Sequence, residues 1–209
     1  MTPNARVAAA IEILDGILAG APAEQHLTRW ARGHRFAGSG DRAAIRDHVF
    51  DALRRRRSAA ALGGAETGRG LMLGLIRAAG DVNPDTVFDG KGYGPAVLTE
   101  EERVLPPPPE GTAALDCPAA LEPMLRDSLG NDFAAVMRLM QSRAPVFLRV
   151  NVHLTMRDDA VEALAADGIE ARPYTLSDTA LEVIGNTRKI RSCQSFLTGL
   201  VEVQDAASQ

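Results

Sequence analysis

The residues of the types that perform catalysis or bind metals match no self-contained motif in their spacing. Walker A, GxGxxG, HExxH and GxSxG patterns are all absent. No two of the histidines stand at metal-ligand spacing, so we expect each on the surface or in helix packing; they are His26, His34, His48 and His153. Neither Cys117 nor Cys193 has a CxxC partner, which argues against a disulfide framework or a zinc site.

Cys117 stands in an Asp-Cys-Pro sequence that could suggest a nucleophile. A thiolate forms near neutral pH only beside a cation or a helix N-terminus. The residues around Cys117 are acidic or proline, so we expect no catalytic role for it.

Two basic clusters give the strongest functional signal. The first is a run of four guanidiniums at an expected helix end, and the second lies in an expected loop between strands; their members are Arg54, Arg55, Arg56 and Arg57, then Arg188, Lys189 and Arg191. Such groups can neutralise several phosphates and release counterions. Cations at a helix C-terminus also stabilise its dipole, and charged runs are often solvated surface. Charge alone therefore leaves RNA contact and surface solvation as alternatives.

Composition and charge narrow the class of protein. With 209 residues, 45% of them hydrophobic and 24% charged, the chain is typical of a globular protein of one or two domains. Its longest charge-free run is too short to span a membrane, and charged residues interrupt any N-terminal signal sequence, so we expect a cytoplasmic protein. The net charge of -4 is uneven: residues 1–57 hold ten arginines against six acidic residues, and residues 81–135 hold three bases against eleven acids. Only a local basic face could bind nucleic acid.

The first half of the chain is predicted to be helical. Apolar spacing and capping residues indicate helices over 3–19 and 22–32, a third helix capped by Asp41, and a fourth over 71–79. Thr99 and Glu102 form a capping box. No strand is expected before residue 140.

A run of four prolines, residues 106–109, predicts a semi-rigid connection near a domain boundary. Beyond it, helical patterning resumes and then gives way to β-rich segments at 146–150, 169–174, 180–184 and 200–204. We predict a mostly α protein of the α+β class, in which a helical bundle precedes a small α+β domain with a short mixed sheet. The expected parts are a helical domain (1–105), a proline-rich linker (106–118) and the α+β domain (119–209).

Three segments carry a family resemblance. "APVFLRVN" at 144–151, "LAADGIEARP" at the end of the following helix and "GLVEVQDAASQ" at 199–209 resemble, in this order and spacing, the RsmB/Sun (Fmu) family of RNA cytosine-C5 methyltransferases. Residues 1–62, with "GDRAAIRDHVFDALRRRR", are similar to that family's N-terminal helical domain, which resembles the transcription antitermination factor NusB.

The resemblance implies that RNA recognition and methyl transfer belong to different domains. In that family the "QDxxSQ" segment leads into a Rossmann-like domain that binds S-adenosylmethionine and carries two active-site cysteines, and the given sequence stops at this segment. Neither cysteine here matches the family's Pro-Cys or Thr-Cys setting, so no catalytic residue and no cofactor contact is assigned to this chain. Its expected partners are 16S rRNA and its own C-terminal methyltransferase domain, without a membrane. The residues expected to order the junction to that domain are Arg149, Asn151, Gln204, Asp205, Ser208 and Gln209.

Two other hypotheses remain open from the sequence. One is a freestanding NusB-like module that binds RNA or protein in antitermination or ribosome assembly. The other is a purely structural or interaction domain, which the acidic stretch favours.

Overall fold

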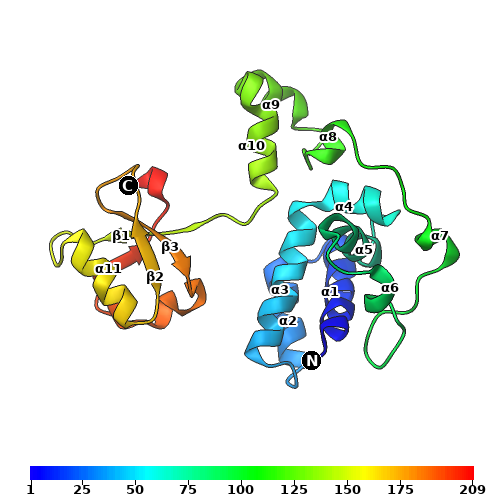
Figure 1. Ribbon diagram of the computed structural model, residues 1–209, viewed down its shortest axis with the longest axis horizontal. Coiled ribbons are helices and arrows are strands. Elements are labelled where there is room, and N and C mark those ends of the chain that lie inside the picture. The colour runs from blue at the N-terminus through cyan, green and yellow to red at the C-terminus, as the bar shows by residue number, and fades with distance from the viewer. The chain divides into compact units, whose positions relative to one another are not determined.

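The structure, a computed structural model, describes all 209 residues and separates into two compact units, Met1–Arg143 and Ala144–Gln209. Figure 1 shows helices and irregular connections in the first unit and a small sheet packed against helices in the second. None of the helices has the length and apolar character needed to cross a bilayer. Each unit has a hydrophobic core of its own.

The first unit contains no strand, as predicted. Its elements are α1 (Pro3–Leu18), α2 (Ala23–Gly33), α3 (Ser39–Arg54), α4 (Arg56–Gly63), α5 (Gly68–Ala79), α6 (Pro84–Val87), α7 (Glu100–Arg103), α8 (Gly111–Ala114), α9 (Glu122–Leu129), the 3-10 helix η1 (Gly130–Asp132) and α10 (Phe133–Met140). Ile13 and Leu14 of α1 are fully buried against residues of α3 and α5, so α1 lies at the centre of the bundle.

The start of α3 differs from the prediction. Asp41 is not the N-cap; the helix begins at Ser39, and the Asp41 carboxylate reaches back from the third helical position to the backbone N–H of Gly38 at 3.2 Å. The same carboxylate binds the N-terminal amine of Met1 and the guanidinium of Arg6. It therefore joins the starts of α1 and α3. Local sequence signals do not show these contacts.

Helices α4 and α5 approach each other through glycines. A Cβ atom on Gly74 would lie 1.9 Å from the carbonyl oxygen of Ala59, and one on Gly63 would lie 1.8 Å from the carbonyl oxygen of Gly70. Only glycine permits such a backbone approach. These positions set the spacing of the two helices.

Residues after the proline run form a small cluster in which Leu115, Cys117, Phe133 and Met137 are buried. Helix α8 contacts α4, so this segment is compact with the helical unit. The division of the structure after Arg143 consequently falls later than the linker predicted at 106–118.

The second unit is a four-stranded sheet with helices on one face. Its elements are β1 (Val146–Val150), α11 (Arg157–Ala166), β2 (Glu170–Pro173), β3 (Ala180–Gly185), the 3-10 helix η2 (Thr187–Ser192), α12 (Gln194–Leu197), β4 (Val201–Val203) and the 3-10 helix η3 (Ala206–Ser208). The strand order is β2-β3-β1-β4. Leu148 of the central strand β1 pairs with Leu181 and Val203 and packs over Leu164 of α11.

The mostly α, α+β class is confirmed, but the prediction of a mixed sheet was wrong. Every neighbouring pair of strands is antiparallel. The crossover through α11 leaves β1 and β2 parallel in direction, yet β3 inserts between them. No parallel ladder forms as a result.

We predict that Gly74→Ala lowers the free energy of unfolding in urea by about 1–3 kcal/mol, the usual cost of overpacking. The added methyl group meets the backbone of Ala59, which cannot move without displacing α4. This cost should exceed the ~1 kcal/mol by which alanine favours a helix over glycine.

Gly40, in the first turn of α3, is the matched control because no atom lies within 4 Å of the Cβ it would gain. Gly40→Ala should raise the free energy of unfolding by ~0.4–1 kcal/mol. If Gly74→Ala were as stable as the wild type, the close approach of α4 and α5 would be refuted.

Candidate nucleic-acid interface

The first basic cluster lies at a break between two helices rather than at a single helix end. Helix α3 ends at Arg54, Arg55 leaves helical geometry with φ -114° and ψ 34°, and α4 begins at Arg56. The chain turns within the run, so the four guanidiniums do not share one helix face. Sequence patterning missed α4 because its apolar residues are mostly alanines.

Three of the four arginines make contacts inside the chain. Arg54 pairs with Asp51, and Arg56 pairs with Glu66. The Arg57 guanidinium donates to the backbone carbonyl oxygen of Cys117. Arg55, half-buried at the break, is the member with no ion pair or hydrogen-bonding side-chain contact.

Asp116 is the group that fixes this break. Its carboxylate accepts hydrogen bonds from the backbone N–H groups of Arg57 and Ser58, both at 2.8 Å, and from the Ser58 hydroxyl at 2.7 Å. The Gln141 amide donates to it at 2.7 Å. Asp116 thus caps α4 from 58 residues away and holds a backbone with φ 52° to do so.

Cys117 has a structural place beside this cap. It is fully buried in the small cluster with Leu115 and Phe133, and its thiol lies 3.6 Å from the carbonyl oxygen of Pro118. The Asp-Cys-Pro sequence therefore positions a helix cap and a core residue. No sequence signal identifies Asp116 as a cap, because the helix it serves is distant in the chain.

The second basic cluster was expected in a loop between strands. It lies instead on the 3-10 helix η2. Ile190 is buried in the core of the sheet unit, whereas Arg188, Lys189 and Arg191 are exposed. Asn186 begins the turn in the left-handed region at φ 59°, and its side-chain amide donates to the carbonyl oxygen of Gly168 at 2.8 Å. A buried side chain and a side-chain hydrogen bond therefore hold three cationic groups on a fixed turn.

Asp167 fixes the segment that follows η2. Its carboxylate accepts from the Ser195 hydroxyl at 2.6 Å and from the Ser195 backbone N–H at 2.8 Å. These two bonds, the hydroxyl first, hold the pKa of Asp167 below its ordinary value. Because Ser195 belongs to α12, the carboxylate ties α12 and the end of η2 to the C-terminus of α11.

The predicted junction residues gather at two places on the sheet unit. Gln209 donates to the carbonyl oxygens of Leu148 and Gln204 and accepts from the Thr179 hydroxyl at 2.9 Å. Arg149 lies 3.4 Å from Gln204 and also pairs with Glu202.

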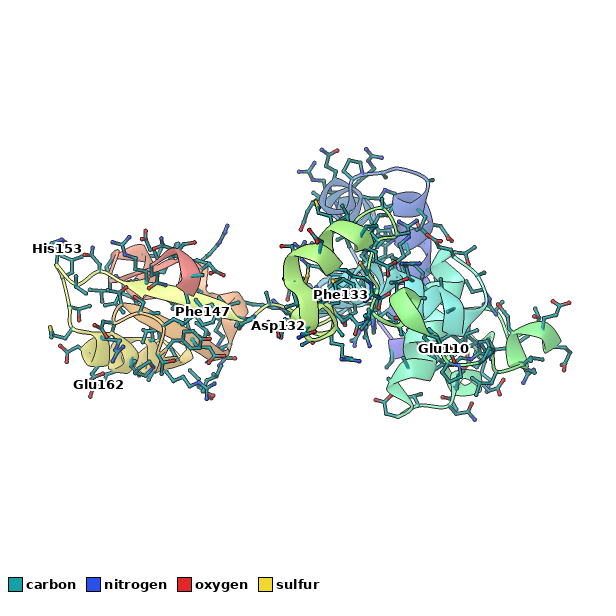
Figure 2. The ribbon with its side chains drawn as sticks, turned by 90° about the horizontal axis from the view of Figure 1, so that it is seen from above. Glu110, Asp132, Phe133, Phe147, His153 and Glu162 are labelled. Carbon is teal, nitrogen blue, oxygen red and sulfur yellow. The ribbon has the colours of Figure 1, made fainter.

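The three other junction residues take part in local turns. Asp205 caps η3, a helical turn that the sequence did not predict, and Gln204 donates to the backbone carbonyl oxygen of Ser208. Asn151 lies at the end of β1, where its side chain donates to the carbonyl oxygen of Gly199 and accepts from the backbone of His153. Figure 2 shows Phe147 on β1 and His153 in the loop after that strand.

Each of the histidines of the helical unit has a local environment of its own. His26 packs on Gly16, His34 stacks on Trp30, and burial holds the pKa of the half-buried His48 below its ordinary value. No three metal-ligating side chains come together in the structure.

Comparisons with known proteins relate part of the chain to ribosomal RNA methyltransferases. The family model described as "Methyltr_RsmF/B-like, ferredoxin-like domain" matches residues 118–188. "Ribosomal RNA small subunit methyltransferase B" of Pseudomonas syringae pv. tomato (strain ATCC BAA-871 / DC3000) is 30% identical over 92 residues, which are 44% of this chain and 20% of that protein. The chain therefore spans about a fifth of the length of this relative.

Among solved structures, the crystal structure of PH0851 is similar over 100% of this chain and 54% of its own, with a TM-score of 0.61 and 16% identity. At that identity the likeness concerns the fold. The match to the family model crosses the structural division after Arg143, so the predicted boundary at 106–118 stays a prediction.

We predict that Arg57→Ala lowers the melting temperature by ~2–4 °C, the shift that ~1 kcal/mol produces in a unit of this size. Its guanidinium bonds a buried carbonyl, which the variant leaves with one donor fewer. Arg55→Ala is the matched control and should melt within about 1 °C of the wild type, since the Arg55 side chain makes no ion pair or hydrogen bond that the variant would lose. Equal melting temperatures for the two variants would contradict the assigned contacts.

Acid should destabilise the sheet unit through Asp167. A carboxyl group whose pKa is lower in the folded than in the unfolded chain stabilises the fold above its unfolded pKa, and that contribution disappears as the pH falls through the folded pKa. We therefore expect the melting temperature to fall as the pH drops below about 4. Asp167→Asn should melt lower at pH 7 and lose less on acidification, as followed by circular dichroism. If the melting temperature of Asp167→Asn fell on acidification as far as that of the wild type, Asp167 would not be the cause of the acid destabilisation.

Proposed function

We propose that this chain is the RNA-binding N-terminal part of an S-adenosylmethionine-dependent 16S rRNA cytosine-C5 methyltransferase of the RsmB/Sun family, to whose members part of it is similar. Its task is to position the rRNA for a C-terminal Rossmann-like domain. The observation that carries this proposal is the 30% identity to a small-subunit rRNA methyltransferase across 92 residues.

The residues of this chain do not fit S-adenosylmethionine. Open sheets that bind nucleotide-like cofactors do so at the carboxyl ends of parallel strands, beside a helix N-terminus. Here every neighbouring pair of strands is antiparallel. We assign methyl transfer to the C-terminal domain and derive no step of it on this chain.

The cluster on η2 is the best placed to contact phosphates. Its side chains are exposed, and buried Ile190 keeps the turn in place, so little ordering is needed when RNA binds. Contacts of this kind fix the register of the RNA without reading its sequence. Arg188, Lys189 and Arg191 are therefore proposed as RNA-positioning groups.

The Arg54–Arg57 cluster is proposed to contribute less than its charge suggests. Arg57 is engaged with the Cys117 carbonyl, and Arg54 with Asp51. Arg55 is available, and Arg56 can exchange its exposed partner Glu66 for a phosphate because surface ion pairs are weak.

The polar cluster at the chain's last residues is proposed to order the junction to the catalytic domain. Arg149 and Gln204 hold the outer strand, and the Gln209 side chain binds back to β1. Asn151 closes the other side of β1. Asp205 and Ser208 shape the turn between them.

We predict that the 209-residue chain binds a 16S rRNA fragment and that the affinity falls as salt rises. In the triple variant Arg188→Gln, Lys189→Gln and Arg191→Gln, the slope of log K against log salt should shrink by about 2, since a single-stranded contact contributes ~0.7. Fluorescence anisotropy of a labelled fragment at several salt concentrations measures it.

The control removes the same charge elsewhere on the surface, at Arg103, Arg126 and Arg138, and should keep most of the slope. An unchanged slope in the η2 variant would exclude that cluster. A wild-type chain that ignores the fragment even in dilute buffer would overturn the proposed function.

A further inference from the structure

A separate group of arginines surrounds the turn between α2 and α3. Arg29, Arg32, Arg35 and Arg42 are all exposed, and none pairs with a carboxylate. Asp41, the acid nearest in sequence, is already held by the N-terminal amine and Arg6, which lower its pKa. The positive field of the four arginines is therefore left without an internal counter-charge.

Three of these arginines share one hollow. Arg32, Arg35 and Arg42 line a cleft of about 520 Å³ together with Thr28 and Ala31. They come from the end of α2, the following turn and the first turn of α3. Such a cleft suits phosphate oxygens, which accept several guanidinium hydrogen bonds at once.

An aromatic groove of about 900 Å³ lies next to the cleft, because residues of the same segment, 30–36, line one or the other. Trp30, His34, Phe36 and Tyr93 line it over a floor of small α1 residues. The Trp30 and His34 rings stack 4.2 Å apart, and the Phe36 ring meets His34 edge-on. Phe36 is 72% and Tyr93 89% exposed, so these two rings contribute little to the core and are open to a planar ligand.

The groove also offers polar groups to a ligand edge. His34 Nδ1 lies 2.8 Å from the Trp30 carbonyl oxygen, which can only accept, so Nδ1 carries the proton and Nε2 is an acceptor in the neutral ring. Glu12 uses one carboxylate oxygen for the Trp30 indole N–H. The other oxygen and the Lys91 side chain complete the lining.

We infer that single-stranded RNA crosses the α2–α3 turn, with its phosphates in the arginine cleft and an unstacked base in the aromatic groove. This inference rests on the proposed RNA-binding function and adds a second contact surface to it. Arg35 lines the cleft and its chain neighbours His34 and Phe36 line the groove, so one strand can reach both.

Charge complementarity selects this occupant. An acidic peptide suits the arginines but meets the Glu12 and Asp89 carboxylates in the groove. A basic peptide suits the groove and is repelled by the four arginines. A nucleotide strand supplies anionic phosphates and planar bases with amino groups, and base–aromatic stacking is tolerant of sequence.

Trp30 is the chain's single tryptophan, so its fluorescence reports occupation of the groove. A ten-nucleotide oligouridylate should quench it on binding to the 209-residue chain. In Arg32→Gln/Arg35→Gln/Arg42→Gln, the affinity should fall about tenfold or more and the salt slope by about 2.

Phe36→Leu/Tyr93→Leu tests the stacking surface. The affinity should fall about five- to tenfold with an unchanged salt slope, because rings and not charges are lost. Both positions are exposed, and the melting temperature of each variant is measured alongside. The variant with Arg103, Arg126 and Arg138 changed to Gln is the matched charge control and should bind like the wild type.

The outcomes separate this inference from the proposed function. If the 16S rRNA fragment binds but oligouridylate neither quenches Trp30 nor responds to these variants, the α2–α3 surface is excluded and the proposed function stands. If a ten-residue polyglutamate binds as tightly as the oligonucleotide and Phe36→Leu/Tyr93→Leu has no effect, the surface is an acidic-protein site and the inference is overturned. If no RNA binds at all, both fail.

Discussion

One carboxylate attaches the last part of the helical unit to the helix bundle. Asp116 caps α4 through the N–H groups of Arg57 and Ser58, and in doing so attaches the chain that follows the prolines to the bundle. Without this cap, α4 would begin with unsatisfied donors, and the helix pair α9–α10 would lose its nearest link to α4. The same anchor brings the Cys117 carbonyl to the Arg57 guanidinium. Arg57, a member of the basic run that looks most functional in the sequence, is thus used to hold the fold together.

Local signals in the sequence were sufficient for several elements whose ends are fixed by residues within one turn of chain. The Thr2 cap and Pro3 placed α1, the Thr99–Glu102 box placed α7, and β-branched residues placed β1. The break at Arg55 was not predictable, because its cause is an acid 61 residues further along the chain. The prediction of a mixed sheet was wrong for a similar reason: tertiary packing, and not the local sequence, places β3 between β1 and β2.

Candidate site residues show the same limit. A run such as Arg54–Arg57 attracts notice because its charges are adjacent in sequence, yet internal partners occupy most of them. Arg32, Arg35 and Arg42 are spaced apart and look unremarkable, and folding brings them to one cleft without partners. What distinguishes a binding cation from a structural one is the carboxylate or carbonyl that faces it, and only the structure shows that group.

Several carboxylates of the acidic stretch that favoured a non-RNA protein have partners inside the fold. Glu102 binds Arg69, whose guanidinium lowers its pKa, Asp85 pairs with Arg103, and Asp116 serves as a cap. Carboxylates used in this way do not cancel the exposed arginines elsewhere, because fields between exposed charges are screened within about 10 Å at ordinary salt. The two proposed RNA contacts lie on separate units of one chain, and where both engage the same RNA, the first to bind would raise the effective concentration of the second to roughly millimolar. Under the proposed function, a protein with net charge -4 therefore binds RNA through local basic surfaces rather than through its total charge.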